Sequence, residues 1–297
     1  MSRILITGIN GQLGFELRRS LAMLGECICL DRQQLDLSRP DDIAAVLDQT
    51  QPDIIVNPAA YTAVDKAESE AQLAHAVNTI APAAMANWAA AKNALLLHYS
   101  TDYVFDGDKA DAYLEEDTSN PQSVYGQSKW QGEQAIRASG ANHIILRTSW
   151  VVGVHGGNFL KTIMRLARER DSLNVVADQI GAPTPAALIA DVTAHIIKQW
   201  QVEPPKMPLG TYHLASSGST SWHGYTEYLL ALAERYSIAL QLKPENLHAI
   251  PSSAYPTPAK RPGNSRLNCS KIEHAFGLTM PAWQSGVEHV FQQIFNS

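Results

Sequence analysis

The chain alternates short apolar runs with longer segments in which apolar residues recur at helical spacing. The segments of helical spacing predict helices over 12–24, 40–49, 67–92 and 123–139. The apolar runs predict five strands, over Ile4–Thr7, Cys27–Leu30, Asp53–Val56, 94–99 and His143–Arg147. These runs are apolar throughout rather than alternating, which is typical of parallel strands covered by helices on both faces. The expected fold class is therefore α/β, with a doubly wound parallel sheet of the Rossmann type.

The second half of the chain is less regular. It predicts helices over 158–170, 187–200 and 222–236 and a strand over Thr211–Ala215. The segment Pro251–Asn268 is rich in proline, serine and basic residues, which is typical of an ordered loop beside a site. We therefore expect a first domain over 1–153, with returning elements around 185–217. A smaller, discontinuous α/β domain, mainly 154–297, should bind a substrate across a shared cleft.

A glycine-rich turn joins the first predicted strand to the first predicted helix. Its glycines at positions 8, 11 and 14 allow a tight turn, close approach of a pyrophosphate, and close packing of the helix on the strand. The start of the helix offers free N–H groups and a positive dipole to the phosphates. We expect the first domain to bind a dinucleotide through Gly8, Asn10, Gly11, Gln12, Leu13 and Gly14.

Residues after the second and third strands extend this site. Asp31 lies twenty residues after Gly11, where an acid binds the adenosine ribose and favours NAD. Arg32 follows it and can pair with a 2′-phosphate, so both NADPH and NADH remain candidate cofactors. Asp36 and Leu37 are placed to contact the adenine. The segment Ala60, Tyr61 and Thr62 follows the third strand, and its neighbouring alanines allow the backbone to approach the cofactor.

Three further residues carry candidate chemistry. Tyr125 and Lys129 are four residues apart on a predicted helix and share one face. An ammonium beside a phenol is expected to lower the pKa of the tyrosine, which then donates a proton to a developing alkoxide near neutral pH. Thr101 closely follows the fourth predicted strand, at its carboxyl end, where its hydroxyl faces the cofactor crevice and can bond a substrate carbonyl. The ten histidines form no cluster, and we assign none of them a catalytic role.

With these elements in this order, the chain resembles an extended short-chain dehydrogenase/reductase. Within that family, residues 100–107 (STDYVFDG) resemble the dTDP-4-dehydrorhamnose reductase branch. Four other segments do so too: 57–68, 146–151, 178–184 and 261–267. The resemblance implies reduction of the 4-keto group of dTDP-6-deoxy-L-lyxo-4-hexulose to dTDP-L-rhamnose by NADPH or NADH. It also implies that Tyr125 donates the proton, that Lys129 tunes it and binds the nicotinamide ribose, and that Thr101 orients the carbonyl.

The resemblance assigns further residues by position. It adds Tyr99 to the cofactor site, and it places Thr101, Asp102 and Trp150 on the sugar, with Val64 and Tyr103 beside them. Cations in the 251–268 loop, Lys260, Arg261 and Arg266, are candidates for the substrate diphosphate. Some relatives form dimers through magnesium held by acidic side chains. Glu16 and Glu288 remain here, but Ala187 stands where an acid is common. We therefore assign no metal and keep Glu16 as the one residual candidate.

Two alternatives stay open beside this interpretation. One is a 4-ketoreductase of another nucleotide-linked deoxysugar, and the other is a non-catalytic subunit that binds a dinucleotide and a partner protein. Sugar-nucleotide dehydratases need an acid after Thr-Asp, and Tyr103 lacks that carboxylate, so the sequence favours reduction without elimination.

The bulk composition limits the partners. A net charge of −6 argues against a nucleic-acid binder, and no apolar stretch is long enough to span a membrane. Three cysteines without framework spacing and a start without a signal peptide predict a cytoplasmic protein. We expect it to act as a monomer or homodimer on a nucleotide-sugar.

Overall fold

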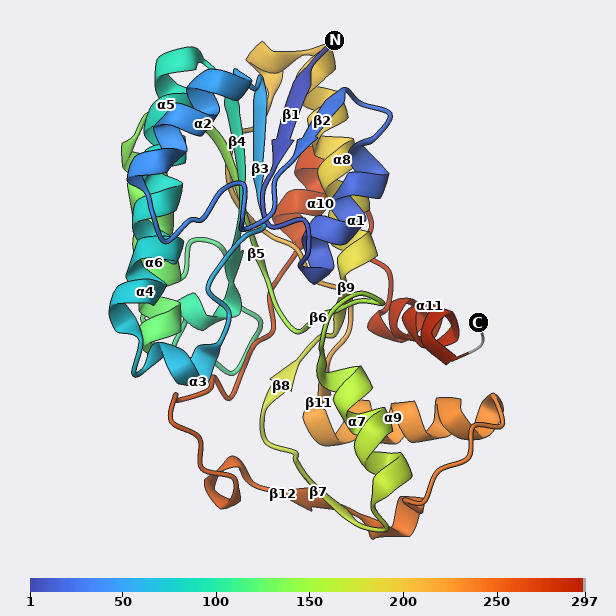
Figure 1. The fold of residues 1–297 in the computed structure, drawn as a ribbon. Helices are drawn as coiled ribbons and strands as arrows, with labels where there is room; N and C mark the ends of the chain where they lie inside the picture. The colour runs from blue at the N-terminus through green and yellow to red at the C-terminus, as the bar shows by residue number, and fades with distance from the viewer. Residues whose placement is uncertain (296–297) are drawn as a thin grey trace.

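Six parallel strands form a sheet at the centre of the larger part of the molecule (Figure 1). The computed structural model describes residues 1–295. Every neighbouring pair is parallel. In spatial order the strands are β10 (Gly210–His213), β5 (Asn142–Thr148), β4 (Leu95–Thr101), β3 (Ile54–Asn57), β1 (Arg3–Ile6) and β2 (Glu26–Cys29). The predicted doubly wound parallel sheet is therefore confirmed, and the strand order reverses between β1 and β3, where such folds bind ligands.

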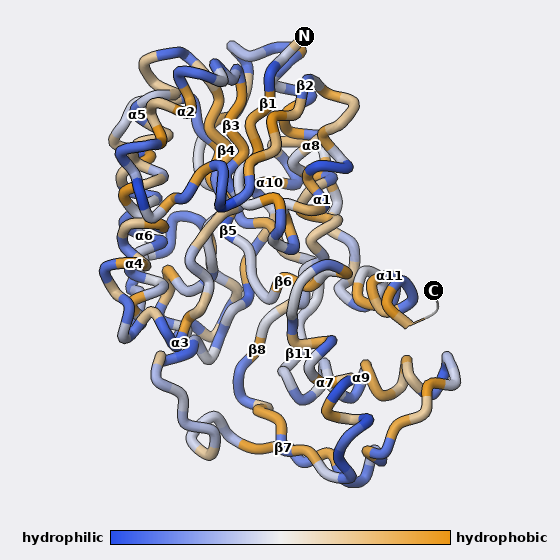
Figure 2. The backbone as a smooth tube through the Cα atoms, in the orientation of Figure 1, coloured by the Kyte–Doolittle hydropathy of each residue, from blue (hydrophilic) through white to orange (hydrophobic). Residues whose placement is uncertain are grey.

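Helices cover both faces of this sheet because alternate strand residues point to opposite sides. Ile4 and Ile6 of β1 join one apolar cluster, whereas Leu5 joins the other. Figure 2 shows hydrophobic residues along β1 and β3 at the centre of the sheet. The first cluster packs α1 (Gln12–Leu21), α8 (Ala186–Val202) and α10 (Ser270–Phe276) on the sheet. The second packs α2 (Asp41–Thr50), α5 (Ala81–Lys92) and α6 (Val124–Ala138) on it.

The single helix expected over 67–92 is wrong. The segment instead forms α3 (Val64–Ala67), α4 (Ala71–His75), a π-helical turn (Ala76–Ile80) and α5. The π turn contains the buried Asn78, whose side chain accepts a hydrogen bond from the N–H of Tyr61 (2.8 Å) and donates to Ser128 Oγ (3.0 Å). Helix α5 follows the π turn without a break and has a proline in its first turn. The interruption fixes the loop after β3 against α6.

The smaller part of the molecule has an apolar core of its own, which includes Leu160, Leu229 and Phe291. Its helices are α7 (Phe159–Glu169), α9 (Trp222–Arg235) and α11 (Trp283–Phe295). Its paired strands are β7 (Leu173–Val176) with β12 (Leu247–Ile250), β6 (Val151–Val152) with β9 (Thr184–Pro185), and β8 (Ile180–Gly181) with β11 (Thr220–Ser221). The helices predicted over 158–170, 187–200 and 222–236 are confirmed. Between them, α8 and β10 return to the large sheet. Figure 1 shows the sheet strands pointing toward this smaller part.

A buried ion pair joins α6 to β5. The guanidinium of Arg147 binds both carboxylate oxygens of Glu133, at 2.9 and 2.7 Å, and Arg137 adds a contact at 3.0 Å. Glu133 is fully buried and Arg147 is 2% exposed. Burial by itself raises the pKa of Glu133, but the bonds and charge of Arg147 outweigh it and hold that pKa below its usual value. The carboxylate therefore stays charged and neutralises a buried arginine.

Replacing this acid should destabilise the fold strongly. In a Glu133→Gln variant Arg147 keeps its charge in the interior without a counter-ion, which costs about 3–5 kcal/mol of unfolding free energy. Urea unfolding of the variant and the parent chain measures this difference. Glu169→Gln is the matched control, because Glu169 pairs with Arg165 at an exposed surface and should change stability little. Equal unfolding curves for the parent and Glu133→Gln would contradict the argument.

Candidate active site

The glycine turn leaves a cradle between β1, α1 and β3. Gly8 has a φ of +56°, and a Cβ there would lie 2.8 Å from the Cβ of Ala59. A Cβ on Gly14 would lie only 2.2 Å from the carbonyl oxygen of Gly8. Helix α1 begins after Gly11, and no side chain caps this end within residues 1–295. The free N–H groups and the bare backbone suit a pyrophosphate, so the turn fits a dinucleotide.

A cavity of about 550 Å³ opens over this turn. Most of the residues expected to bind the cofactor line it, together with two of the three catalytic candidates. They are Gly8, Gly11, Gln12, Leu13, Gly14, Arg32, Asp36, Leu37, Ala60, Tyr61, Thr62, Tyr99, Tyr125 and Lys129. Residues from five separate segments thus meet in one cavity. The phenol of Tyr99 itself bonds Thr193 at 2.7 Å in the core, so this residue offers its backbone to the cavity.

Two of the predicted cofactor residues, Asn10 and Asp31, lie outside the lining of the cavity. The carbonyl of Asn10 is 3.1 Å from Nε2 of His155. The carboxylate of Asp31 accepts hydrogen bonds from the N–H groups of Gln33 and Gln34, at 2.9 and 3.1 Å. Arg32 reaches the cavity instead, with a largely exposed side chain 3.6 Å from Asp36. The cation, rather than the acid, therefore stands at the adenosine end.

Sequence reasoning missed part of the wall. The missed residues are Leu35, Pro58, Leu73, Val77, Ser100, Thr148, Val151, Gly156 and Gly157. The pair Gly156 and Gly157 belongs to the loop between β6 and α7. Asn158, the N-cap of α7, donates to Oε1 of Gln12 at 2.9 Å and so ties this loop to the glycine turn. The doublet of glycines before a capping asparagine is the signal that could have found this segment.

Tyr125 and Lys129 lie on successive turns of α6, which begins at the N-cap Ser123. Lys129 is 2% exposed, and its Nζ donates to the carbonyl of Tyr99 at 2.6 Å. Nε2 of His98 lies 3.1 Å from the same nitrogen. Burial lowers the pKa of Lys129 to about 8, although the charge of Glu133 opposes this shift. The helical spacing thus places a phenol and an ammonium at the same cavity.

The expected lowering of the tyrosine pKa is wrong for this structure. Burial raises the pKa of the Tyr125 phenol, and the hydroxyl of Thr101 opposes that shift only in part. The charge of Asp102 and the neighbouring Tyr103, whose ring meets Tyr125 edge-on at 5.5 Å, push the pKa further up. Lys129 directs its ammonium to Tyr99 and His98 rather than to the phenol. The phenol of Tyr125 is therefore held in its neutral form.

Thr101 and Asp102 form a buried polar pair at the end of β4. The hydroxyl of Thr101 donates to Oδ1 of Asp102 at 3.0 Å and accepts from the N–H of Tyr103 at 3.2 Å. Burial raises the pKa of Asp102 to about 6, and bonds from Ser265 and Thr101 oppose the shift. Within residues 1–295, the second oxygen of Asp102 is buried without a partner.

Arg261 lies in the loop that leads from β12 of the smaller part to α10 on the large sheet. Its guanidinium binds Asp65 of α3 at 2.7 Å and donates to the phenol oxygen of Tyr103 at 3.2 Å. Val64 precedes Asp65 and begins α3. Of the other two cations in the loop, Lys260 lies 3.4 Å from Gln122. Arg266 bonds Asn264 and the carbonyl of Ala110, which ties down its own loop. Arg261 is thus the cation that the structure brings to Tyr103.

Trp150 follows β5 in a left-handed backbone conformation, with a φ of +47°. Its indole stacks on Trp222 of α9, with ring centroids 3.5 Å apart and planes within 11°. A Cβ on Gly181 would lie 2.6 Å from the same indole. Trp222 was not predicted as a site residue. A strained backbone and close packing on both sides hold the indole between the two parts of the molecule.

Glu16, the residual metal candidate, is an ion-pair residue here. It binds Arg19 at 3.2 Å, and the same guanidinium binds Asp191 at 2.9 Å. Glu288 pairs with Arg235 at 2.7 Å. Within residues 1–295, no group of three or more histidine, cysteine or acidic side chains has an arrangement that would hold a metal ion.

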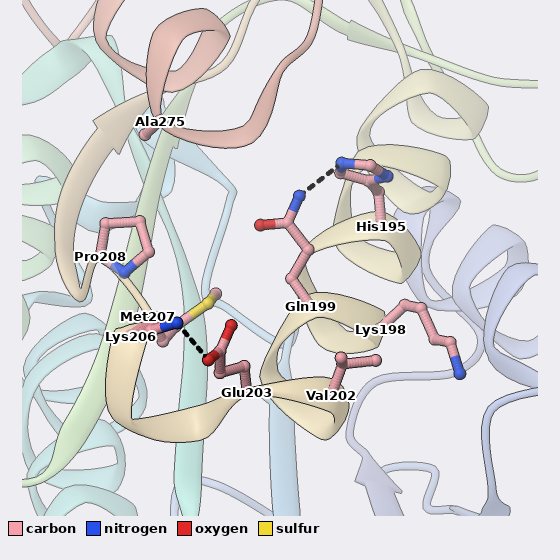
Figure 3. Close-up of a pocket in the computed structure, with 9 residues that line it drawn as sticks. All are labelled: His195, Lys198, Gln199, Val202, Glu203, Lys206, Met207, Pro208 and Ala275. Atoms are coloured by element: carbon pink, nitrogen blue, oxygen red, sulfur yellow. Dashed lines mark hydrogen bonds and ion pairs between the residues drawn. The ribbon is translucent and has the colours of Figure 1, made fainter.

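A second cavity, of about 500 Å³, lies beside the C-terminal half of α8 (Figure 3). Its walls come from His195, Lys198, Gln199, Val202, Glu203, Lys206, Met207, Pro208 and Ala275. Gln199 contacts His195 at 2.8 Å, and Lys206 pairs with Glu203. Residues expected to bind cofactor or substrate do not line it. The two cavities have similar volumes, but the candidate catalytic and cofactor-binding residues line only the first of them. We therefore take the first cavity as the candidate active site.

Comparison with known proteins identifies the family. The family described as the RmlD substrate binding domain matches residues 1–296. The chain is 46% identical over 298 residues to the dTDP-4-dehydrorhamnose reductase of Shigella flexneri. The aligned region covers 99% of this chain and 98% of that protein.

Solved structures of dTDP-4-dehydrorhamnose reductases have the same fold as this chain. A dTDP-4-dehydrorhamnose reductase from Clostridium acetobutylicum superposes with a TM-score of 0.90 at 33% identity, over 98% of this chain and 99% of that one. A homologue from Bacillus anthracis, solved in complex with NADP, gives a TM-score of 0.89 at 33% identity over the same shares. The resemblance seen in the sequence is confirmed, and the chain belongs to the dTDP-4-dehydrorhamnose reductase family.

Proposed function

We propose that the chain reduces the 4-keto group of dTDP-6-deoxy-L-lyxo-4-hexulose to give dTDP-L-rhamnose, with NADPH or NADH as the reductant. One observation carries the proposal: the glycine turn, Tyr125 and Lys129 line a single cavity. Family membership narrows the substrate, because relatives such as the Shigella flexneri protein bear the name of this reductase. The nearest alternative, another nucleotide-linked deoxysugar, would use the same residues.

The chain's own residues supply binding and proton transfer. The turn at Gly8–Gly14 would hold the pyrophosphate, and Lys129 would hold the nicotinamide ribose. A bound reduced nicotinamide supplies the hydride that reaches the carbonyl carbon. Thr101 then donates a hydrogen bond to the carbonyl oxygen, on which negative charge develops, and this requires its hydroxyl to turn away from Asp102. Tyr125 delivers a proton to that oxygen; its raised pKa still suits the task, because an alkoxide is a stronger base than a phenolate.

Contacts to the rest of the substrate would come from the segment after β4, from α3, from Trp150 and from the 251–268 loop. Arg261 can turn its guanidinium to the diphosphate, and Asp102 can accept a sugar hydroxyl. Trp150 is only partly buried and would contact the sugar ring with the part of its indole that is left exposed. Tyr103 and Val64 complete this side of the cleft.

We also place the protein in the cytoplasm, as a monomer or homodimer. All three cysteines are free thiols, which suits a reducing compartment. Within the described residues, none of the helices combines the length and the apolar character that a membrane crossing needs. A single copy contributes every residue named in the candidate site, so the proposed chemistry is complete in one chain.

A coupled assay tests the proposed reaction and the role of Tyr125 together. The purified chain, dTDP-glucose, the upstream dehydratase and epimerase, and NADPH or NADH should yield dTDP-L-rhamnose as the cofactor is oxidised. Tyr125→Phe should bind the dinucleotide as the parent does and lose about 10²–10⁴-fold in kcat, because the proton donor is gone. The exposed Tyr255→Phe is the control and should match the parent. Normal turnover by Tyr125→Phe would refute the assigned role, and a folded parent without turnover would refute the substrate.

The position of Arg32 predicts a test of cofactor choice. Arg32→Ala should raise KM for NADPH about tenfold, because the guanidinium would pair with the 2′-phosphate, and should change KM for NADH little. Initial rates with each cofactor measure this ratio. Arg39→Ala is the matched control, because Arg39 pairs with Asp42 at 2.9 Å and lies outside the cavity lining. An equal change in both KM values would show that Arg32 does not distinguish the cofactors.

A further inference from the structure

A continuous chain of buried polar side chains runs beneath the candidate site. Nζ of Lys129 on α6 lies 3.1 Å from Nε2 of His98 on β4. Nδ1 of His98 lies 3.1 Å from Nδ2 of Asn57 on β3, and Oδ1 of Asn57 lies 2.6 Å from the hydroxyl of Thr7 after β1. All four residues are at most 2% exposed. The chain crosses three neighbouring strands and links the lysine to the start of the glycine turn.

Hydrogen-bond valence constrains this chain. A neutral imidazole carries one N–H, so only one of its nitrogens donates. An ammonium at Lys129 has no lone pair and must donate to Nε2, so the imidazole proton is then on Nδ1. Nδ1–H needs an acceptor from Asn57, so this amide, whose Nδ2 faces His98 in the structure, must turn to present its oxygen. A charged Lys129 therefore requires the Nδ1–H tautomer of His98.

We propose that His98 is the positioning residue of Lys129: its Nε2 accepts a hydrogen bond from the ammonium and keeps this lysine charged at the cavity wall. The inference rests on the proposed reduction and assigns a role to a residue that touches neither cofactor nor substrate. The carbonyl of Tyr99 takes a second N–H of the ammonium. The third N–H is left for the cavity, which Lys129 lines.

Electrostatics explain why this support is needed. The titratable groups around Lys129 are His98 on β4 and, on its own helix, Tyr125 and Glu133. Burial lowers the pKa of Lys129 to about 8, against the charge of Glu133. Burial, and then the charge of Lys129, hold the pKa of His98 well below its usual value, so the imidazole stays neutral and can accept. Removing this acceptor leaves a buried ammonium one bond short and lowers its pKa further.

Two variants test the two nitrogens of the His98 ring separately: Nε2, which faces Lys129, and Nδ1, which faces Asn57. His98→Gln places an amide near the position of Nε2 and keeps an acceptor for Lys129. His98→Asn has a shorter side chain, which reaches the position of Nδ1 and keeps the partner of Asn57 but leaves Lys129 without its acceptor. We expect kcat/KM of His98→Asn to fall about 10–100-fold at pH 7.5, because a hydrogen bond to a charged group is lost. His98→Gln should recover most of that loss.

The pH profile distinguishes positioning from a general loss of packing. Activity that needs the ammonium falls as pH rises through the pKa of Lys129, near 8 in the parent. In His98→Asn this fall should move to lower pH by about one unit, and in His98→Gln it should stay near the parent value. His143→Asn is the control for a histidine replacement, because His143 lies near the start of β5 and outside the cavity lining. Equal profiles for His98→Asn and the parent would overturn the proposal.

A measurement without substrate keeps the test independent of the proposed reaction. Nitrogen-15 NMR of histidine-labelled parent protein assigns the His98 ring by the signal that is lost in His98→Gln. At pH 6.5 this ring should have a bare Nε2 and a protonated Nδ1. The buried His213, whose Nδ1 lies 3.0 Å from the carbonyl of Tyr113, should give the same pattern in both proteins. A protonated Nε2 on His98 at pH 6.5 would overturn the proposal, even if His98→Asn did not fold. A parent chain without reductase turnover but with the expected tautomer would instead refute the function and leave the contact with Lys129 standing.

Discussion

Burial of the Lys129 ammonium is the constraint around which the site is built. A charge taken out of water must be neutralised or fully bonded, because an unpaired one costs several kcal/mol. Here the carbonyl of Tyr99 and the ring of His98 bond the ammonium, and Glu133 lies one turn further along α6. Glu133 also neutralises Arg147, so the same carboxylate serves the fold and the site. A change at any of these groups alters both stability and the charge at the cavity wall.

The strands and the glycine turn were predictable because their signals are local. A continuous apolar run needs only its own residues to indicate a parallel strand, and the glycines at 8, 11 and 14 reveal a backbone that tolerates no Cβ. The short strands β6, β8, β9 and β11 span two residues each, too few for any periodicity. The π turn between α4 and α5 was not predicted, for another reason. It depends on Asn78 bonding Tyr61 and Ser128, which are distant in sequence.

The candidate site also has features that local sequence predicts and features that depend on tertiary contacts. The helical spacing of Tyr125 and Lys129 correctly indicated that both reach one cavity, but it did not indicate which atoms the ammonium would bond. Tertiary contacts decide that, and they direct Nζ to His98 and Tyr99 rather than to the phenol. The raised pKa of Tyr125 follows from burial, which no spacing reveals. His98 lacked a motif and was therefore overlooked, although its neighbours along β4 were assigned. Family resemblance supplied the residues whose role depends on a ligand.

An anionic ligand must be bound by a chain whose net charge is −6. The structure meets this requirement with cations that are already paired: Arg261 with Asp65, and Arg32 with Asp36. Such pairing fixes the guanidinium before a phosphate arrives and so reduces the ordering cost of binding. The phosphate must then compete with the carboxylate, which weakens binding but rejects weaker anions. Arg261 lies in the loop that leads from β12 to α10, whereas Asp65 and Tyr103 belong to the larger part. A diphosphate bound to Arg261 would therefore compete with the two contacts that hold this loop on the larger part.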